Sequence, residues 1–259
     1  MQVSTVASRT FTPQQLAKTI DQSVLRQTHT FSDVEANAKL SLKHGFRALV
    51  VDPYYAKQAR DLLKGSDVLC ASVCDFPHGR ETTDTRVSAV KNLLAIGVDE
   101  VDIVAKYHLL LENNVKDFKE DIRSVVKAMS GVPLKIILEV DNLTPEQIKK
   151  ATSLICEVAK EESAKNLIVK TKTGFAQKVN IQNIDAVKLI RQVLDENKLY
   201  AENIEEIKNG KLGIKASSGM KSKDDVIPAL NMGAHIIGTS SGVDIIGESA
   251  GTVSNPNSY

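Results

Sequence analysis

The chain has 259 residues, of which 42% are hydrophobic and 25% are charged, and its formal net charge at pH 7 is +1. This composition is typical of a globular protein with enough apolar material for a sizeable core, and the balanced charge argues against a nucleic-acid or anionic-membrane partner. No apolar stretch approaches the roughly 18 residues that a membrane-spanning helix needs.

Eight short apolar runs, most of them rich in β-branched residues, predict eight strands. In chain order they cover residues 20–25 (the faintest), 48–51, 68–73, 100–104, 134–140, 166–169, 211–216 and 235–238.

Helical patterns lie between these runs. Three helices have capping-box starts at Ser32, Thr144 and Ser222, and glycines end the first and third of these at Gly45 and Gly233. The other predicted helices are a stripe through Val87, Val90 and Leu94 that ends at Gly97, and segments near 54–64, 115–129 and 183–197. Residues 198–210 have the composition of a charged surface insertion.

Alternating strands and helices predict an α/β protein with a parallel sheet. Eight units in about 250 residues fit a single closed (β/α)₈ TIM barrel better than an open sheet, which the sequence alone leaves as an alternative. We therefore expect one domain over residues 1–259, with an N-terminal extension at 1–12 and a flexible C-terminal tail at 248–259.

The cysteines and the N-terminus predict a cytoplasmic location. The three cysteines, Cys70, Cys74 and Cys156, cannot form a fully paired set, and none has zinc-site spacing with a histidine. The first ten residues are polar and lack the apolar core of a signal peptide.

In a barrel of this kind, chemistry is expected at the carboxyl ends of the strands. Lys170 and Lys215 each end an apolar run, and the two runs are consecutive. Side by side inside a barrel, each ammonium disfavours the charge of the other, and desolvation acts in the same direction. A neutral amine is the form that attacks a carbonyl to give a Schiff base, so the pair predicts this chemistry, with a surface lysine as the alternative reading of either residue alone.

Asp102 lies between Val101 and Ile103 within a predicted buried strand. A buried carboxylate needs a partner, and lysines across the barrel would supply one. Its expected role is proton transfer, with a purely structural ion pair as the alternative.

Three loops of small hydroxyl and glycine residues follow late strands, at 171–174, 217–220 and 238–242. Such loops expose backbone N–H groups, and barrels often bind phosphate at the loops after strands 7 and 8. We expect an anion site where the three loops converge.

Taken together, these residues resemble the 2-deoxyribose-5-phosphate aldolase family, whose members are class I (Schiff-base) aldolases with a (β/α)₈ barrel. The resemblance runs over nearly the whole chain. The matching segments are 18–21 (KTID), 52–55 (DPYY), 76–79 (FPHG), 99–102 (DEVD), 134–139 (LKIILE), 169–171 (VKT), 213–217 (GIKAS) and 238–242 (GTSSG).

The resemblance implies a role for each matched residue. Lys170 corresponds to the Schiff-base lysine, Lys215 to the lysine that tunes it, and Asp102 to the proton-relay aspartate. Gly174, Gly219, Gly238, Ser240 and Ser241 correspond to the phosphate loops, and Lys135 and Glu139 to polar residues lining the site. Tyr259 corresponds to a terminal tyrosine that in some members reaches the active site. A disordered terminus is the alternative for Tyr259.

The sequence departs from the family pattern at several positions. Lys172 stands where a small hydroxyl residue is usual, and alternation predicts that it points the same way as Lys170, near the amine or the phosphate. Ser218 replaces a glycine, which puts a Cβ where backbone should approach phosphate. Gln22 replaces a usual histidine, and Asp52 and Asp75 are further departures.

The implied activity is reversible cleavage of 2-deoxy-D-ribose 5-phosphate to acetaldehyde and D-glyceraldehyde 3-phosphate, without a metal or organic cofactor. The expected partners are a phosphosugar and an aldehyde, with a homodimer left open. The departures leave three alternatives: a weak or inactive aldolase-fold protein that acts as a binding or scaffold module, a Schiff-base aldolase for another phosphosugar, and a metal-dependent aldolase.

Overall fold

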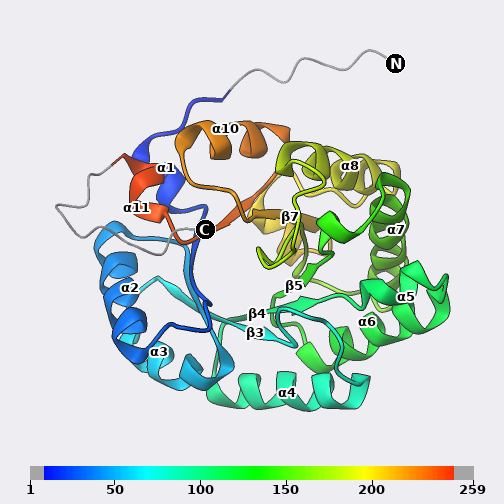
Figure 1. Cartoon of the computed structure of the whole chain (residues 1–259), viewed down its shortest axis with the longest axis horizontal. Coiled ribbons are helices and arrows are strands. Elements are labelled where there is room, and N and C mark those ends of the chain that lie inside the picture. The colour runs from blue at the N-terminus through cyan, green and yellow to red at the C-terminus, as the bar shows by residue number, and fades with distance from the viewer. Residues whose placement is uncertain (1–8, 248–259) are drawn as a thin grey trace.

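The computed structural model describes residues 9–247, in which eight parallel strands close into a barrel with helices around the outside (Figure 1). The strands are β1 (Ile20–Val24), β2 (Ala48–Val51), β3 (Leu69–Cys74), β4 (Glu100–Val104), β5 (Leu134–Ile137), β6 (Leu167–Lys170), β7 (Leu212–Ser217) and β8 (Ile236–Thr239). Each strand pairs with its neighbours in sequence, and β8 closes the barrel against β1. The predicted (β/α)₈ barrel is confirmed. The predicted tail at 248–259 and residues 1–8 of the predicted extension lie outside the described residues.

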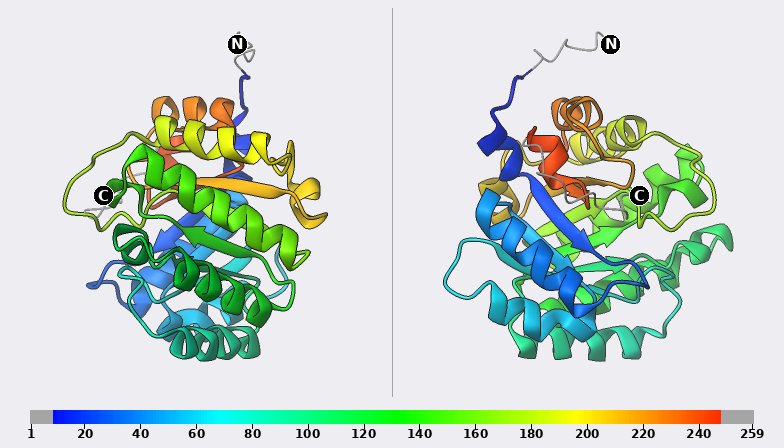
Figure 2. Two further views of the ribbon diagram at one scale, coloured as in Figure 1. Left: turned by 90° about the vertical axis from the view of Figure 1, so that its right-hand side faces the viewer. Right: turned by 60° about the vertical axis from the view of Figure 1, so that its left-hand side comes forward.

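The helices lie outside the strands in each view (Figure 2). They are α1 (Pro13–Ala17), α2 (Phe31–His44), α3 (Ala56–Leu62), α4 (Thr83–Ile96), α5 (Tyr107–Leu111), α6 (Val115–Met129), α7 (Pro145–Glu161), α8 (Asn183–Glu196), α9 (Ile204–Lys208), α10 (Lys223–Met232) and α11 (Gly242–Ile246), with 3₁₀ turns η1 (Pro53–Tyr55) and η2 (Val140–Asn142). Between residues 9 and 247, none of the helices is both long and apolar enough to cross a membrane.

Helix starts follow local capping chemistry. Thr144 and Ser222 begin α7 and α10 with reciprocal capping boxes, as predicted. The predicted box at Ser32 is wrong by two residues, because Thr30 exchanges these hydrogen bonds with Asp33 and α2 begins at Phe31.

The segment 198–210 is only in part the charged surface insertion that its composition predicts. Glu202 and Glu205 are exposed, but Ala201 and Ile207 are buried. Ile207 of α9 packs against the backbone of Gly213 in β7, where an added Cβ would lie 2.4 Å from its Cδ1 atom. The acidic residues conceal this contact in the sequence, because one buried isoleucine in a five-residue helix leaves no periodic pattern.

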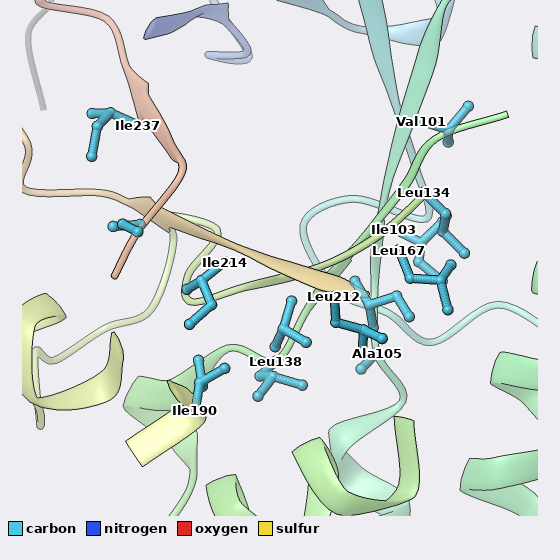
Figure 3. Packing of buried hydrophobic residues seen from close by; sticks show 14 of the residues in the cluster. Val101, Ile103, Ala105, Leu134, Leu138, Leu167, Ile190, Leu212, Ile214 and Ile237 are labelled. Carbon is cyan, nitrogen blue, oxygen red and sulfur yellow. The ribbon is translucent and has the colours of Figure 1, made fainter. Parts of the chain in front are cut away.

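The strands place large apolar side chains on the outer face of the barrel, whereas the inner face carries the charged side chains together with a small apolar cluster that includes Val50 and Val73. Val101 and Ile103 belong to the large apolar cluster between strands and helices, which Ile190 of α8 also joins (Figure 3). Alternation turns Glu100 and Asp102 of the same strand inward, where both are buried. The barrel therefore carries a charged interior within an apolar shell.

All three cysteines are buried and unpaired. Burial raises the thiol pKa of Cys70 to about 12, of Cys74 to about 11 and of Cys156 to about 12.

Candidate active site

Two lysines and an aspartate meet inside the barrel. The register of β6 and β7 places Lys170 directly beside Lys215, as the predicted strand ends require. Both amines donate to the same Oδ2 atom of Asp102, Lys170 at 2.9 Å and Lys215 at 3.0 Å. The structure thus brings together three residues that lie far apart in the sequence.

Asp102 is the centre of a larger set of buried charges. Its Oδ1 atom accepts from Lys135 at 2.8 Å, and Lys135 also lies 2.6 Å from Oε2 of Glu100. The Lys215 amine also donates to Oδ2 of Asp21 at 2.6 Å. The Arg47 guanidinium forms ion pairs with both Asp21 and Glu100. We call this set the barrel charge network; its members are Asp21, Arg47, Glu100, Asp102, Lys135, Lys170 and Lys215.

Electrostatics inside the network set Lys170 apart. Burial lowers the pKa of the Lys170 amine to about 8, with Lys215 and Lys135 acting in the same direction and Asp102 opposing them. Burial would raise the pKa of Asp102, but Lys135, Lys170 and Lys215 together hold it well below its usual range. The pKa of Lys135 is raised, because Asp102, Asp21 and Glu100 outweigh its burial. Lys170 is therefore about half neutral near pH 8 and to a smaller extent at pH 7, beside a carboxylate that stays ionised.

Lys170 and Lys215 line a pocket at the carboxyl end of the barrel. The other lining residues are Asp21, Ser23, Leu25, Val50, Thr173, Gly174, Ser217, Ser218, Gly219, Met220, Lys221, Gly238, Thr239, Ser240 and Ser241. The ring of Phe76 lies 5.9 Å from the Lys170 amine and packs edge-on against Phe175. This apolar cover contributes to the desolvation that favours the neutral amine.

The three predicted loops do converge on this pocket. Gly174 and Gly219 adopt left-handed backbone, with φ of +91° and +71°. Ser218, also left-handed with φ of +68°, is held by the Asn183 amide of α8, which donates to its carbonyl oxygen at 2.5 Å. Thr239 donates to the carbonyl of Met220 at 2.6 Å and so ties the β8 loop to the β7 loop.

Lys172 does not face the pocket, and the expectation that it adds charge beside Lys170 is wrong. Strand β6 ends at Lys170, so alternation does not extend to Lys172. Its buried amine instead binds Asp141 at 2.9 Å and the carbonyl of Ile181. The same Asp141 carboxylate accepts from the backbone of Asn180, so Lys172 fastens the β6 loop to the turn after β5.

Lys135 also differs from its predicted place, and Gly238, which does line the pocket, has a second role there. Lys135 is fully buried beneath Asp102 and is absent from the pocket wall, so it cannot contact a phosphate group there. Gly238 lines the pocket, but its lack of a side chain makes room for Lys215, whose Cε atom would lie 2.9 Å from an added Cβ.

Glu139 and Gln22 do not line the pocket but hold two of its loops in place. Glu139 has a left-handed backbone and accepts hydrogen bonds from the amide and hydroxyl of Thr173. Burial raises the pKa of this carboxyl. The Gln22 amide donates to the carbonyl of Ser240 at 3.0 Å and accepts from the backbone N–H of Gly242, which anchors the β8 loop on β1.

Sequence reasoning missed several residues that the geometry places at or near the site. Asp21 and Glu100 lie in segments that carry the family resemblance, but the resemblance gives them no role. Inward alternation with Asp102 was the available signal for Glu100. Arg47 lies outside every motif, and Lys221 reaches the pocket from the rim. Tyr259 lies outside the described residues. Within 9–247, no group of three or more His, Cys, Asp or Glu side chains could hold a metal ion.

Comparison with known proteins finds similarity to aldolases. Residues 15–253 match the family model described as DeoC/LacD family aldolase. A deoxyribose-phosphate aldolase of Caldicellulosiruptor saccharolyticus is 31% identical over 92% of this chain and 99% of its own length, and one of Thermococcus kodakarensis is 34% identical over 90% and 96%. The deoxyribose phosphate aldolase of Aeropyrum pernix, whose structure is described as tetrameric, superposes with a TM-score of 0.74 at 28% identity and covers 91% of both chains.

Proposed function

The chain belongs to the DeoC/LacD aldolase family, and we propose that it cleaves 2-deoxy-D-ribose 5-phosphate reversibly to acetaldehyde and D-glyceraldehyde 3-phosphate through a Schiff base on Lys170. One observation carries the proposal: a buried amine that opens onto the pocket has its pKa lowered to about 8. A neutral amine in such a place is equipped to attack an aldehyde.

The reaction begins with the unprotonated Lys170 amine adding to the C1 aldehyde of the open-chain sugar. The carbinolamine then loses water and becomes a protonated imine. Lys215 is the neighbouring proton donor for the departing hydroxyl, since both amines share one oxygen of Asp102. Because three lysines keep its pKa low, Asp102 stays a carboxylate, and its assigned role is to orient these two amines and the water that passes protons between them.

Cleavage uses the imine as an electron sink. The C3 hydroxyl gives its proton to the water oriented by Asp102, the electron pair of the C2–C3 bond moves toward the iminium nitrogen, and D-glyceraldehyde 3-phosphate departs. The same water returns the proton in the next step. The remaining enamine takes a proton at C2, and hydrolysis of the imine releases acetaldehyde and restores Lys170. The positive nitrogen supplies the electron-withdrawing role that a metal ion serves in other aldolases.

The phosphate end of the substrate is assigned to the glycine and serine loops. Gly174, Gly219, Ser240 and Ser241 line one side of the pocket, and the exposed Lys221 adds a cation at its rim. Backbone N–H groups in left-handed turns bind anions well, and an ammonium strengthens that binding.

We further propose a cytoplasmic enzyme that self-associates. Unpaired, buried cysteines fit a reducing compartment, and the Aeropyrum pernix relative is described as a tetramer. Size-exclusion chromatography with light scattering tests the assembly, and fractionation of the source cells tests the compartment.

Borohydride trapping tests the function directly. The purified chain is incubated with acetaldehyde, reduced with sodium borohydride and digested, and the peptides are analysed by mass spectrometry. We expect an ethyl group on Lys170 and cleavage of 2-deoxy-D-ribose 5-phosphate in a coupled assay.

The control is the exposed Lys178 in the same protein, which should stay largely unmodified. A folded protein that carries no ethyl group on Lys170 would favour the scaffold alternative. An adduct without cleavage of this sugar would favour an aldolase for another substrate.

A further inference from the structure

The barrel charge network extends from the pocket to the opposite end of the barrel. Arg47 immediately precedes β2, and Glu100 is the first residue of β4, so both lie at the amino ends of the strands. Neither lines the pocket. Among residues 9–247, their ion pairs lead to Lys170 through other members of the network.

Two chains of contacts lead from these residues to the reactive amine. Glu100 lies 2.6 Å from the Lys135 amine, which lies 2.8 Å from Asp102, which in turn accepts from Lys170 at 2.9 Å. Arg47 binds Asp21, and Asp21 binds Lys215, which shares the Oδ2 atom of Asp102 with Lys170. A change of charge at either distal residue is therefore felt at Lys170 through groups of low solvent exposure.

The network contains more basic groups than acidic ones. Its basic members are Arg47, Lys135, Lys170 and Lys215, and its acidic members are Asp21, Glu100 and Asp102. With every member ionised, the network carries one more positive than negative charge. Glu139, the further carboxyl that faces Lys170, lies outside the network, and burial raises its pKa toward the neutral form. The charges balance when one lysine is neutral, and the one next to the pocket and Phe76 is Lys170.

We infer that Arg47 and Glu100 are positioning residues that set the charge state of Lys170 from the far end of the barrel. The inference rests on the proposed function, since it explains how the reactive amine is kept neutral. The positive charge of Arg47 disfavours the ammonium form of Lys170, and the negative charge of Glu100 favours it.

Other charged groups face Lys170 from each neighbouring element. Asp102 faces it from β4, Lys135 from β5, Lys215 from β7 and Glu139 from the turn after β5. Asp21 of β1 acts on it through Lys215. All of these lie in or beside the site, whereas Arg47 and Glu100 can be changed without touching the pocket wall.

The test measures the protonation of Lys170 without relying on turnover. Competitive labelling with acetic anhydride across a pH series, read out by mass spectrometry, gives the pH at which half of Lys170 is reactive. For Arg47→Gln we expect this pH to rise by about 0.5 to 1 unit, because a positive charge is lost. For Glu100→Gln we expect it to fall by a similar amount, about 0.5 to 1 unit, because a negative charge is lost.

Two further variants separate charge from structure. Arg47→Lys keeps the charge and changes the shape, so its labelling midpoint should remain at the wild-type value even if its stability falls. The double variant Arg47→Gln/Glu100→Gln keeps the net charge of the wild-type network and should also label near the wild-type midpoint. If Glu100→Gln does not fold, the difference between Arg47→Gln and Arg47→Lys still decides the question.

The outcomes distinguish this inference from the proposed function. Opposite shifts in the two single variants, with the midpoint restored in the charge-preserving variants, support the inference. Unchanged midpoints, or shifts in the same direction, overturn it and leave Arg47 and Glu100 with a structural role. Failure of the proposed function would instead appear as a wild-type protein whose Lys170 has a low labelling midpoint but gives no aldehyde adduct.

Discussion

Two groups of buried charges in this molecule differ in their ratio of basic groups to carboxylates. Outside the barrel, Arg86 of α4 binds Asp121 of α6, lies 3.5 Å from Asp75 and donates to a backbone carbonyl, while Lys106 lies 3.0 Å from Asp121. We call these four residues the helix charge cluster. It holds two cations and two carboxylates, whereas the barrel charge network holds four basic groups and three carboxylates.

The comparison shows that buried charges can either stabilise the fold or lower the proton affinity of a reactive group. In a balanced cluster each charge has a counter-charge, and its removal mainly costs stability. In a cluster with a surplus base, one group is pressed to give up its proton, and that group becomes chemically useful. The predictions below break or sharpen this contrast, beginning with the largest expected effect.

Removing the surplus base should abolish the chemistry without weakening the fold. Lys170→Met is expected to lower the rate of sugar cleavage by about four orders of magnitude or more, as loss of a covalent nucleophile does elsewhere. A folded pKa of about 8 means that the ammonium form is disfavoured inside the protein. The free energy of unfolding at pH 7 should therefore rise, by up to about 3 kcal/mol.

The pH dependence of stability checks the sign of that effect. In the wild type, the unfolded chain holds the Lys170 proton more tightly than the folded protein does, so stability should rise as pH increases from about 8 toward the ordinary lysine value. Urea denaturation at several pH values should show this rise in the wild type and a smaller one in Lys170→Met. The exposed Lys178→Met is the matched control, and equal activity in both variants would reject the imine pathway.

Breaking the helix charge cluster should do the reverse. Arg86→Met leaves Asp121 and Asp75 short of a buried cation, and we expect the free energy of unfolding to fall by about 3 to 5 kcal/mol. The labelling midpoint of Lys170 should not move, because the two charge sets share no ion pair among the described residues. A moved midpoint in a protein that is still folded would contradict the separation drawn here.

Changing Lys215 should raise the pKa of Lys170. Lys215→Met removes a neighbouring positive charge and leaves Asp102 freer to pair with Lys170, so the pKa of Lys170 should rise by about 1 unit. The pH profile of kcat/KM would show this as a shift of its acid limb to higher pH. A lowered rate with an unchanged profile would confine Lys215 to proton donation.

The smallest effect is expected at Ser218. A non-glycine residue in the left-handed region costs about 1 to 2 kcal/mol, so Ser218→Gly should recover up to about 1 kcal/mol after the added freedom of the unfolded chain is counted. Backbone could then approach phosphate more closely, and KM for the phosphosugar should fall by a few fold with kcat unchanged. An unchanged KM would indicate that the serine side chain does not obstruct the phosphate.

The barrel could be predicted from the sequence because its strands are separate apolar runs of the right length. Helix α6 lies where a helical segment near 115–129 was predicted, since its apolar face repeats regularly as far as Met129. Short helices such as α5 and α9 could not, because a five-residue segment carries too little periodicity.

The site residues that lie within strands could be predicted from the alternation of side chains, and those beyond the strand ends could not. Lys170, Lys215 and Asp102 end or occupy strands, and strand register fixes their level. Lys172 lies two residues beyond that, where the chain has left the sheet, so alternation gave the wrong direction. Arg47 precedes its strand and acts through partners on β1 and β4, a relation that exists only once the barrel has closed.

The burial of the three sulfur atoms bears on how long such an enzyme would last in use. Acetaldehyde and related products are electrophiles that also modify thiolates, and a protein that generates them is exposed to its own product. Cys70, Cys74 and Cys156 are both enclosed and held in the protonated form, so sulfur should contribute little to self-inactivation. Damage during prolonged turnover should therefore accumulate on amines rather than on sulfur.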